Sequence, residues 1–125
     1  MGGLGADTLS GGAGRDTYRY GRIADSSAGG GDSILDFDGV GGAPGDRIDL
    51  SAVDANVSRG GRQSFSFVTT DLIRPGQLHV VDASGGAGSI VEGEVDGRPG
   101  TDFSLAVADG GAVAAADWVA GDFIL

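Results

Sequence analysis

The sequence has little of the chemistry on which many enzymes and disulfide-stapled domains depend. Its 125 residues include no cysteine, no lysine and a single histidine, His79. Without cysteine, neither a disulfide nor a thiolate metal site can form. One histidine also cannot supply the two-histidine zinc signature of metalloproteases. We therefore expect no catalytic site within the chain and a structural role for His79.

Two further absences concern membranes and export. No apolar run approaches the roughly 20 residues of a membrane-spanning helix, and no charged segment followed by an apolar stretch opens the chain as a signal peptide would. We expect no membrane insertion. Any export should use a route that needs no amino-terminal signal.

The charge of the chain is strongly one-sided. Eighteen acidic residues, all aspartate except Glu92 and Glu94, outnumber eight arginines, and the net charge is −10. Nucleic acid is therefore an unsuitable partner, and multivalent cations are the natural counter-charge. The chain also contains 26 glycines, yet 40% of its residues are hydrophobic, which excludes a collagen-like or wholly disordered chain.

Glycine and aspartate are concentrated in a tandem repeat. Residues 2–10 (GGLGADTLS) and 11–19 (GGAGRDTYR) share the pattern GGxGxDxUx, in which U is large and apolar. The first six residues suit a turn with left-handed backbone positions, and the last three suit a short strand with one inward side chain. Each nonapeptide therefore predicts half a coil of a flattened parallel β-roll.

In such a roll, every second turn lies on the same edge. We therefore expect the turn at residues 2–7 to stack on residues 20–25, and the turn at residues 11–16 to stack on residues 29–34. The later turns have lost most of the glycine pattern but keep aspartates in or beside them. The expected carboxylate pairs are Asp7 with Asp25, and Asp16 with Asp32 or Asp36.

Calcium is the ion that suits these turns, because Ca²⁺ takes about six to eight hard oxygens and accepts backbone carbonyls as well as carboxylates. A phosphate-binding glycine loop would instead require lysine or a helix N-terminus after the glycines. The nonapeptide resembles the calcium-binding repeat of RTX proteins. The residues expected to surround Ca²⁺ are Gly3, Gly5, Asp7, Gly12, Gly14, Asp16, Asp25, Asp32 and Asp36.

Glycines and prolines divide the remainder into short strands. An antiparallel cap built from these strands would cover the open edge of the roll. Helical turns are expected at residues 51–56, with Ser51 as N-cap, and at residues 112–117. We predict an all-β fold in which residues 1–38 form coils of a parallel β-roll and residues 39–125 form an antiparallel, sandwich-like cap. The predicted strands span residues 33–37, 47–50, 63–69, 77–82, 89–95, 102–108 and 118–125.

A wider resemblance covers nearly the whole chain. DTYRYGRIADSS (16–27), DSILDF (32–37) and DRIDLSAVDAN (46–56), followed by QSFSFV, GQLHVV, IVEGEVDG, TDFSLAV and a terminal DFIL, resemble the carboxy-terminal domain of serralysin-type RTX metalloproteases. The resemblance implies a calcium-loaded roll and cap that follow an amino-terminal passenger, such as a metalloprotease. It also implies an extracellular location after export by the type I secretion apparatus.

In that family the last residues carry the secretion signal, which here corresponds to Asp122, Phe123, Ile124 and Leu125. The residues by themselves are equally consistent with an ordinary last core strand. The family's acidic DGxxD-like loop corresponds to residues 92–102, but Arg98 and Pro99 interrupt its pattern. We therefore expect a turn there and no additional ion site.

Two functions remain open at this point. The first is a secretion and folding module that is triggered by calcium. The second is a module that binds a polysaccharide or a cell surface, as similar modules of alginate epimerases do. A carbohydrate groove would need exposed aromatic and basic side chains, although Tyr18 and Tyr20 suit the core better. The candidates for such a groove are Tyr18, Arg19, Tyr20, Arg22 and Trp118.

Overall fold

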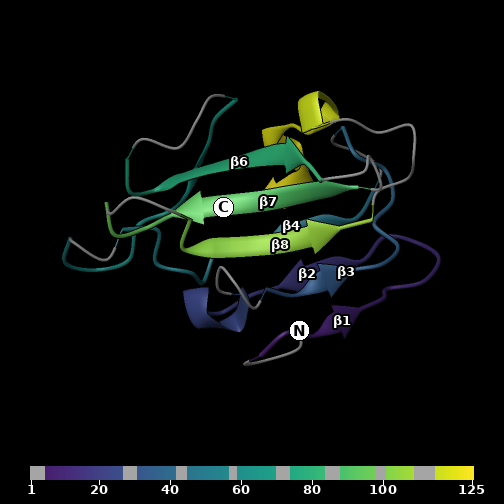
Figure 1. The fold of residues 1–125 in the computed structure, drawn as a ribbon, viewed down its shortest axis with the longest axis horizontal. Helices are drawn as coiled ribbons and strands as arrows, with labels where there is room; N and C mark the ends of the chain where they lie inside the picture. The colour runs from purple at the N-terminus through teal and green to yellow at the C-terminus, as the bar shows by residue number, and fades with distance from the viewer. Residues whose placement is uncertain are drawn as a thin grey trace.

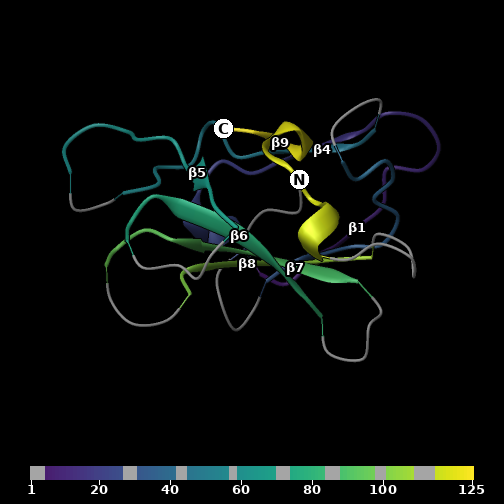
Figure 2. The ribbon, with the colours of Figure 1, turned by 90° about the horizontal axis from the view of Figure 1, so that it is seen from above.

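The computed structural model describes residues 5–26, 31–41, 45–56, 59–69, 74–83, 88–97, 101–108 and 115–125. These residues form nine strands and three short 3₁₀ helices, and the strands make two sheets (Figures 1 and 2). Across these ranges, no helix has the length and apolar character needed to cross a membrane.

The larger sheet is mixed (Figure 1). Its order is β1 (Thr8–Leu9), β3 (Ser33–Ile34), β8 (Phe103–Val107), β7 (Ser89–Glu94), β6 (Gln77–Asp82) and β5 (Ser66–Phe67). β1, β3 and β8 pair in parallel, as do β5 and β6. β7 runs antiparallel to both β6 and β8. Parallel coils of the repeat region and antiparallel strands from later in the chain therefore share one sheet.

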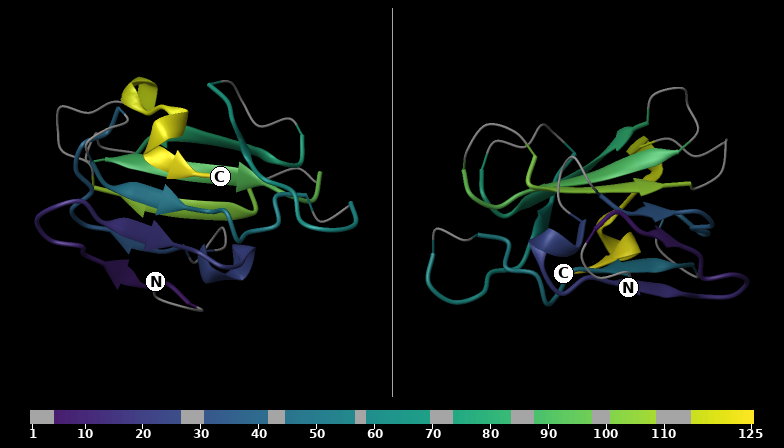
Figure 3. Two further views of the ribbon diagram at one scale, coloured as in Figure 1. Left: turned by 180° about the vertical axis from the view of Figure 1, so that it is seen from behind. Right: turned by 60° about the horizontal axis from the view of Figure 1, so that its bottom comes forward.

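The smaller sheet is entirely parallel, with the order β2 (Thr17–Arg19), β4 (Arg47–Asp49) and β9 (Phe123–Ile124). Figure 3 shows it in front of the larger sheet, and Figure 2 shows the two as separate layers. The predicted all-β class and β-roll are confirmed. Both sheets join strands from the repeat region to strands from the carboxy-terminal half of the chain.

The core lies between the two sheets and includes a row of aromatic rings. From the repeat to the last strand, the ring centroids of Tyr18, Phe37, Trp118, Phe123 and Phe67 are 6.2, 4.8, 5.6 and 5.4 Å apart. Neighbouring rings at such distances stabilise each other beyond the area they bury. This row packs the second nonapeptide against the carboxy-terminal strand.

The predicted helical turn at residues 51–56 is wrong. The backbone N–H and the hydroxyl of Ser51 both donate to Asp49 Oδ1, at 3.0 and 2.6 Å. This bonding gives a turn after β4, because the aspartate two residues earlier competes for the groups that a helix start would use. The second predicted helical turn corresponds in part to η2 (Ala115–Asp117), a 3₁₀ helix, and residues 112–114 lie outside the described residues.

Gly31 allows the repeat region to lie against β8. The Ser26 hydroxyl donates to the Ser104 carbonyl at 2.6 Å and accepts the backbone N–H of Asp32 at 2.9 Å. A Cβ at Gly31 would overlap the Ser104 carbonyl oxygen and would lie 3.2 Å from the Ser26 hydroxyl. Only glycine leaves room for this contact.

We predict that Gly31→Ala lowers the free energy of unfolding by roughly 1–3 kcal/mol, because the new methyl group must push a strand backbone aside. Urea unfolding in millimolar Ca²⁺ measures this change. The control is Gly60→Ala, since a Cβ at Gly60 meets nothing within 4 Å, and its expected change is within about 0.5 kcal/mol. Equal losses in both variants would contradict the packing argument.

Candidate metal centre

Each nonapeptide strand pairs with a segment later in the chain than the repeat spacing predicts. β1 places Thr8 opposite Ser33, and β2 places Thr17 opposite Arg47. The predicted stacking of residues 2–7 on 20–25 and of residues 11–16 on 29–34 is therefore wrong. The physical reason is that the chain forms the 3₁₀ helix η1 (Ile23–Ser26) where a further repeat turn was expected.

The observed stacking brings aspartates together at equivalent positions. The backbone N–H of Asp7 donates to Asp32 Oδ1 at 2.9 Å, and the backbone N–H of Asp16 donates to Asp46 Oδ1 at 2.8 Å. Both accepting residues are buried: Asp32 is 1% exposed and Asp46 is 0% exposed. In each pair, the carboxylate of one coil holds the backbone of the preceding coil.

The sequence analysis missed Asp46. A tripeptide of aspartate, then Ser, Thr or Arg, then Leu, Ile or Tyr occurs four times. It begins at Asp7, Asp16, Asp32 and Asp46. A search for this tripeptide, without any glycine requirement, finds all four residues.

The buried hydroxyl of Tyr20 lies in the field of three carboxylates, which together with it form one electrostatic cluster. Burial raises the pKa of Tyr20, and the charges of Asp32, Asp25 and Asp7 raise it further. Burial is also the main cause of the raised pKa of Asp32, to which the charges of Asp7 and Asp25 contribute. The direct contact of Asp7 is with Asp32, where the repeat spacing had predicted Asp25.

This cluster leaves carboxylate oxygens without a hydrogen bond. Oδ2 of Asp7 and Oδ2 of Asp32 are both buried and have no hydrogen-bond partner among the described residues, and the Tyr20 hydroxyl lies beside Asp32 outside hydrogen-bond geometry. A buried ionised oxygen without a partner is costly. A cation held between these oxygens would remove that cost.

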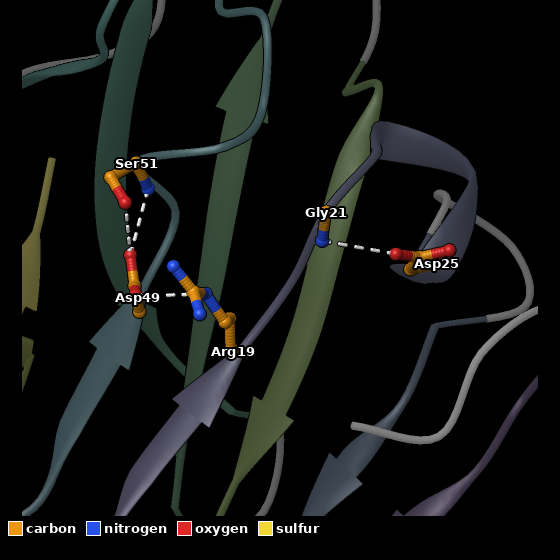
Figure 4. Close-up of polar contacts among 5 residues, drawn as sticks. All are labelled: Arg19, Gly21, Asp25, Asp49 and Ser51. Atoms are coloured by element: carbon orange, nitrogen blue, oxygen red, sulfur yellow. Dashed lines mark hydrogen bonds and ion pairs between the residues drawn. The ribbon is translucent and has the colours of Figure 1, made fainter.

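The negative charge of Asp25 is compensated by its own turn and by Arg22. Its Oδ2 accepts the backbone N–H groups of Gly21 and Arg22 at 3.1 and 3.2 Å, and Arg22 Nε lies 3.4 Å from its Oδ1. Figure 4 shows the contact with Gly21, beside the pairing of Arg19 with Asp49. Asp25 therefore enters the cluster with one oxygen fixed by its own turn.

The second pair of aspartates, Asp16 and Asp46, also includes a buried carboxylate oxygen without a hydrogen bond. Asp46 Oδ2 accepts the backbone N–H of Asp38 at 3.0 Å, while Asp16 Oδ2 is buried and has no hydrogen bond within the described part of the chain. The Asp16 carboxylate lies where a Cβ of residue 11 would be. Glycine at that position lets the turn close over the carboxylate.

Asp36 accepts hydrogen bonds from residues in and around the turn of the second nonapeptide. It accepts hydrogen bonds from the Ser10 hydroxyl at 2.5 Å, the N–H groups of Gly11 and Gly12 at 3.0 and 2.9 Å, and the Tyr18 hydroxyl at 2.9 Å. These donors hold the pKa of Asp36 well below its usual range. Its oxygens are thus already engaged. Asp16 pairs with Asp46, and the predicted pairing of Asp16 with Asp32 or Asp36 is wrong.

The glycines of the repeat adopt the expected backbone. Gly5, Gly12 and Gly14 have φ angles of +104°, +84° and +112°, in the left-handed region that glycine enters without steric cost. Gly3 lies outside the described residues. These three glycines therefore have the left-handed backbone that the repeat predicts.

The last four residues are part of the fold. Asp122 is fully buried, and its carboxylate accepts the N–H groups of Gly41 and Val119. Phe123 and Ile124 form β9, and Leu125 packs against the core. The alternative that these residues form the last core strand is thus what the structure contains.

The aromatic groove considered for carbohydrate does not exist on this fold. Tyr18, Tyr20 and Trp118 are 5%, 0% and 2% exposed. Their rings fill the space between the sheets, as expected for the tyrosines, and cannot contact a ligand. Arg19 and Arg22 are exposed but pair with Asp49 and Asp25.

A further acidic cluster lies in the loop between β7 and β8. Carboxylate oxygens of Glu94, Asp96 and Asp102 lie within 4.8 Å of one another. Glu94 is 5% exposed, and its Oε1 accepts the N–H groups of Asp96 and Gly97 at 3.0 and 2.8 Å. Burial and the neighbouring Asp102 raise the pKa of Glu94. The segment predicted to be only a turn therefore also brings together three groups that could hold a metal.

His79 lies in β6, where its Nε2 is 3.2 Å from Glu92 Oε1 on the neighbouring strand β7. The Thr101 hydroxyl donates to the other oxygen of Glu92 at 3.1 Å. The histidine is thus part of a cross-strand pair on the outer face of the larger sheet, consistent with the structural role expected for it.

The raised pKa of Glu94 predicts how stability depends on pH in excess chelator with a stabilising osmolyte such as sucrose, which keeps the chain folded without Ca²⁺. Wild-type stability should fall as the pH rises from 4.5, the ordinary pKa of the group, through its higher folded-state value. Glu94→Gln removes the charge, and its amide can still accept the two N–H groups. The variant should have a higher urea midpoint than wild type at pH 7, and this difference should vanish as the pH falls to 4.5. A lower midpoint at pH 7 would contradict this assignment.

Comparisons with known proteins agree with this geometry. The family model for the peptidase M10 serralysin C terminal matches residues 1–120. No match is found among curated proteins.

Among solved structures, the chain is similar to the AlgE6R3 and AlgE6R2 subunits of the mannuronan C5-epimerase from Azotobacter vinelandii. For AlgE6R3, the identity is 30% and the TM-score 0.58, and the match covers 98% of this chain and 60% of that one. For AlgE6R2, the identity is 26% and the TM-score 0.59, with 98% and 67% covered. The described strands, the stacked aspartates and the family match lead to one conclusion: the chain belongs to the peptidase M10 serralysin C-terminal family.

Proposed function

We propose that this chain is a non-catalytic module that folds around Ca²⁺ outside the cell and directs the export of a passenger. Calcium binding is implied by the family. The observation that supports it most directly is the set of buried carboxylate oxygens without hydrogen bonds, on Asp7, Asp16 and Asp32. Among the described residues, the aspartates of these coils have one ion pair, between Asp25 and Arg22.

The residues fit Ca²⁺ in type, because carboxylates and backbone carbonyls are the ligands it takes. One ion would be held by Asp7, Asp25 and Asp32, and a second by Asp16 and Asp46, with carbonyls of the adjoining glycine turns completing each set. When bound, Ca²⁺ supplies positive charge and accepts several oxygens at once. The chain's residues bind and orient the two coils, so that ion binding and folding become one event.

The energy of binding can switch the fold only where the chain without Ca²⁺ is slightly unstable. With a dissociation constant of about 10⁻⁴ M, millimolar Ca²⁺ would stabilise the fold by about 1.4 kcal/mol per site, and submicromolar Ca²⁺ would contribute almost nothing. Two sites would supply about 3 kcal/mol, which is less than the typical total of about 5–15 kcal/mol. Our proposal is therefore that the chain without Ca²⁺ is unstable by less than about 3 kcal/mol, so that it is mostly unfolded in a low-calcium cytosol and folded outside.

Asp32→Asn tests the first ion site. In chelator with a stabilising osmolyte such as sucrose, which keeps the chain folded without Ca²⁺, the variant should be at least as stable as wild type, because a buried charge has been removed while the acceptor for the Asp7 N–H is kept. In millimolar Ca²⁺ its stability gain should be smaller by about 1.4 kcal/mol, the contribution of one site. Urea unfolding with and without Ca²⁺ measures both quantities.

The matched control is Asp82→Asn, which makes the same charge change at the exposed end of β6 and can keep the bond to the Ala115 N–H. This control should retain the full stability gain from Ca²⁺. An Asp32→Asn variant with the same gain as wild type would refute the site. A complete β-sheet circular dichroism spectrum in excess chelator would refute folding on Ca²⁺.

The export role rests on the carboxy terminus. We infer that Asp122, Phe123, Ile124 and Leu125 act first as the signal read by the type I secretion apparatus and later as part of the core. The burial of Asp122 and Phe123 is compatible with this order if export precedes folding. The passenger is proposed to be a serralysin-like metalloprotease, and the location extracellular.

Deleting residues 122–125 should abolish export of a passenger fused ahead of the chain, measured as passenger in the medium of a strain with a type I exporter. Because the deletion also removes β9, the control must weaken the fold without altering the terminus. Gly31→Ala does this and should be exported at the wild-type level. Undiminished export of the deletion would refute the signal.

A further inference from the structure

Three Asp–Gly pairs occur in the sequence, at residues 38–39, 96–97 and 109–110. Because glycine has no Cβ, the backbone nitrogen that follows such an aspartate can approach the carboxyl carbon of the aspartate side chain with little steric hindrance. Residues 109–110 lie outside the described part of the chain. The other two pairs have different surroundings, and the structure therefore distinguishes between them.

In the pair at residues 96–97, the glycine nitrogen is held by a buried carboxyl group. The Gly97 N–H donates to Glu94 Oε1 at 2.8 Å, and the Asp96 N–H donates to the same oxygen at 3.0 Å. Glu94 is only 5% exposed. The Gly97 nitrogen can attack a neighbouring carbon only after its hydrogen bond opens, so the fold protects this pair.

In the pair at residues 38–39, the groups that would react are free. Asp38 and Gly39 are both exposed, and neither the Asp38 carboxylate nor the Gly39 N–H has a hydrogen bond among the described residues. The φ angle of Gly39 is +77°, in the left-handed region that glycine enters without steric cost. Solvent therefore reaches both groups, and no described hydrogen bond has to open before they meet.

The fold also activates the peptide group that joins Asp38 to Gly39. Its carbonyl oxygen accepts the backbone N–H of Asp46 at 2.8 Å, and the Asp38 N–H donates to Asp46 Oδ2 at 3.0 Å. A hydrogen bond at a carbonyl withdraws electrons from the nitrogen of the same peptide group, so the Gly39 proton is lost more readily. The two contacts fix the Asp38 backbone, while its exposed side chain remains able to rotate.

From these features we propose that Asp38 is a site of spontaneous isomerisation to isoaspartate. The Gly39 nitrogen forms a bond to Cγ of Asp38, and its proton leaves together with the carboxyl OH group as water. The product is a five-membered succinimide. Water then adds to either of the two ring carbonyl carbons and the C–N bond at that carbon breaks, which gives aspartate or isoaspartate. One water is released and one is consumed, and no oxidant, reductant or cofactor takes part.

Isoaspartate at residue 38 would disturb the second pair of aspartates. It adds one methylene group to the main chain and converts the backbone carbonyl of residue 38 into a free carboxylate, so the two contacts with Asp46 cannot both persist. Asp46 also accepts the N–H of Asp16. The modified chain should therefore lose the stability gain of the second ion. This consequence rests on the proposed function, whereas the isomerisation itself does not.

Peptide mapping by electron-transfer mass spectrometry tests the proposal on the calcium-loaded chain, held at neutral pH and physiological temperature for several weeks. Isoaspartate should form at Asp38 at least about tenfold faster than at Asp96, because only Gly97 must first break a hydrogen bond to a buried carboxyl group. In urea, where neither pair is protected, the two rates should be similar. Equal rates in the folded chain would overturn the proposal, as would the absence of isoaspartate at Asp38 while the unfolded chain forms it.

Asp38→Glu is the matched variant, because it keeps the charge and the backbone contacts with Asp46 while the larger ring that it would have to form closes far more slowly. It should form no product at residue 38 and should keep the wild-type stability gain from Ca²⁺. In aged wild type, the isoaspartate fraction, separated by chromatography, should retain about half of that gain, the share of one of two sites. A modified fraction with the full gain would overturn the link to Asp46, whereas unmodified wild type without any gain would contradict the proposed function instead.

Discussion

The structure depends on one repeated contact, in which a buried aspartate of one coil accepts the backbone N–H of an aspartate in the preceding coil. Asp32 does this for Asp7, and Asp46 does it for Asp16. The contact sets the parallel register of β1 on β3 and of β2 on β4. It also brings two like charges together away from water, and that is unfavourable unless a cation or a proton compensates.

Other carboxylates of this acidic chain have hydrogen-bond donors or an arginine that compensate their negative charge. Asp36 is surrounded by neutral donors from the second nonapeptide, whereas Asp25 and Asp49 each have an arginine. Glu94 and Asp102 lie together with backbone N–H groups around them. Asp7, Asp16 and Asp32 differ from these, because each retains a buried oxygen that has neither a hydrogen bond nor an arginine partner among the described residues.

The second constraint is closure of the two sheets. β8 and β9 come from late in the chain, yet they pair in parallel with β3 and β4 from the early part. The aromatic row from Tyr18 to Phe123 fills the space between the layers. The last strand therefore stabilises the same coils that hold the candidate ions, and folding of the roll and docking of the carboxy terminus are expected to be coupled.

The sequence by itself determined the fold class, the turn conformation and the kind of ion. Glycines at Gly5, Gly12 and Gly14 are required by the left-handed backbone, and the aspartates after them select a hard cation. Each predicted strand contains a strand of the structure, because alternation and glycine boundaries are local properties. The aspartate partners were decided by the tertiary structure. A period of two nonapeptides predicts Asp25 for Asp7, but the chain forms η1 at that point and reaches the stacking position only at Asp32. Asp46 follows GGAPGD (41–46), a degenerate form of the repeat turn that lies outside the nonapeptide spacing. It took the place beside Asp16 because register depends on where the chain returns to the sheet, and no short sequence pattern encodes that distance.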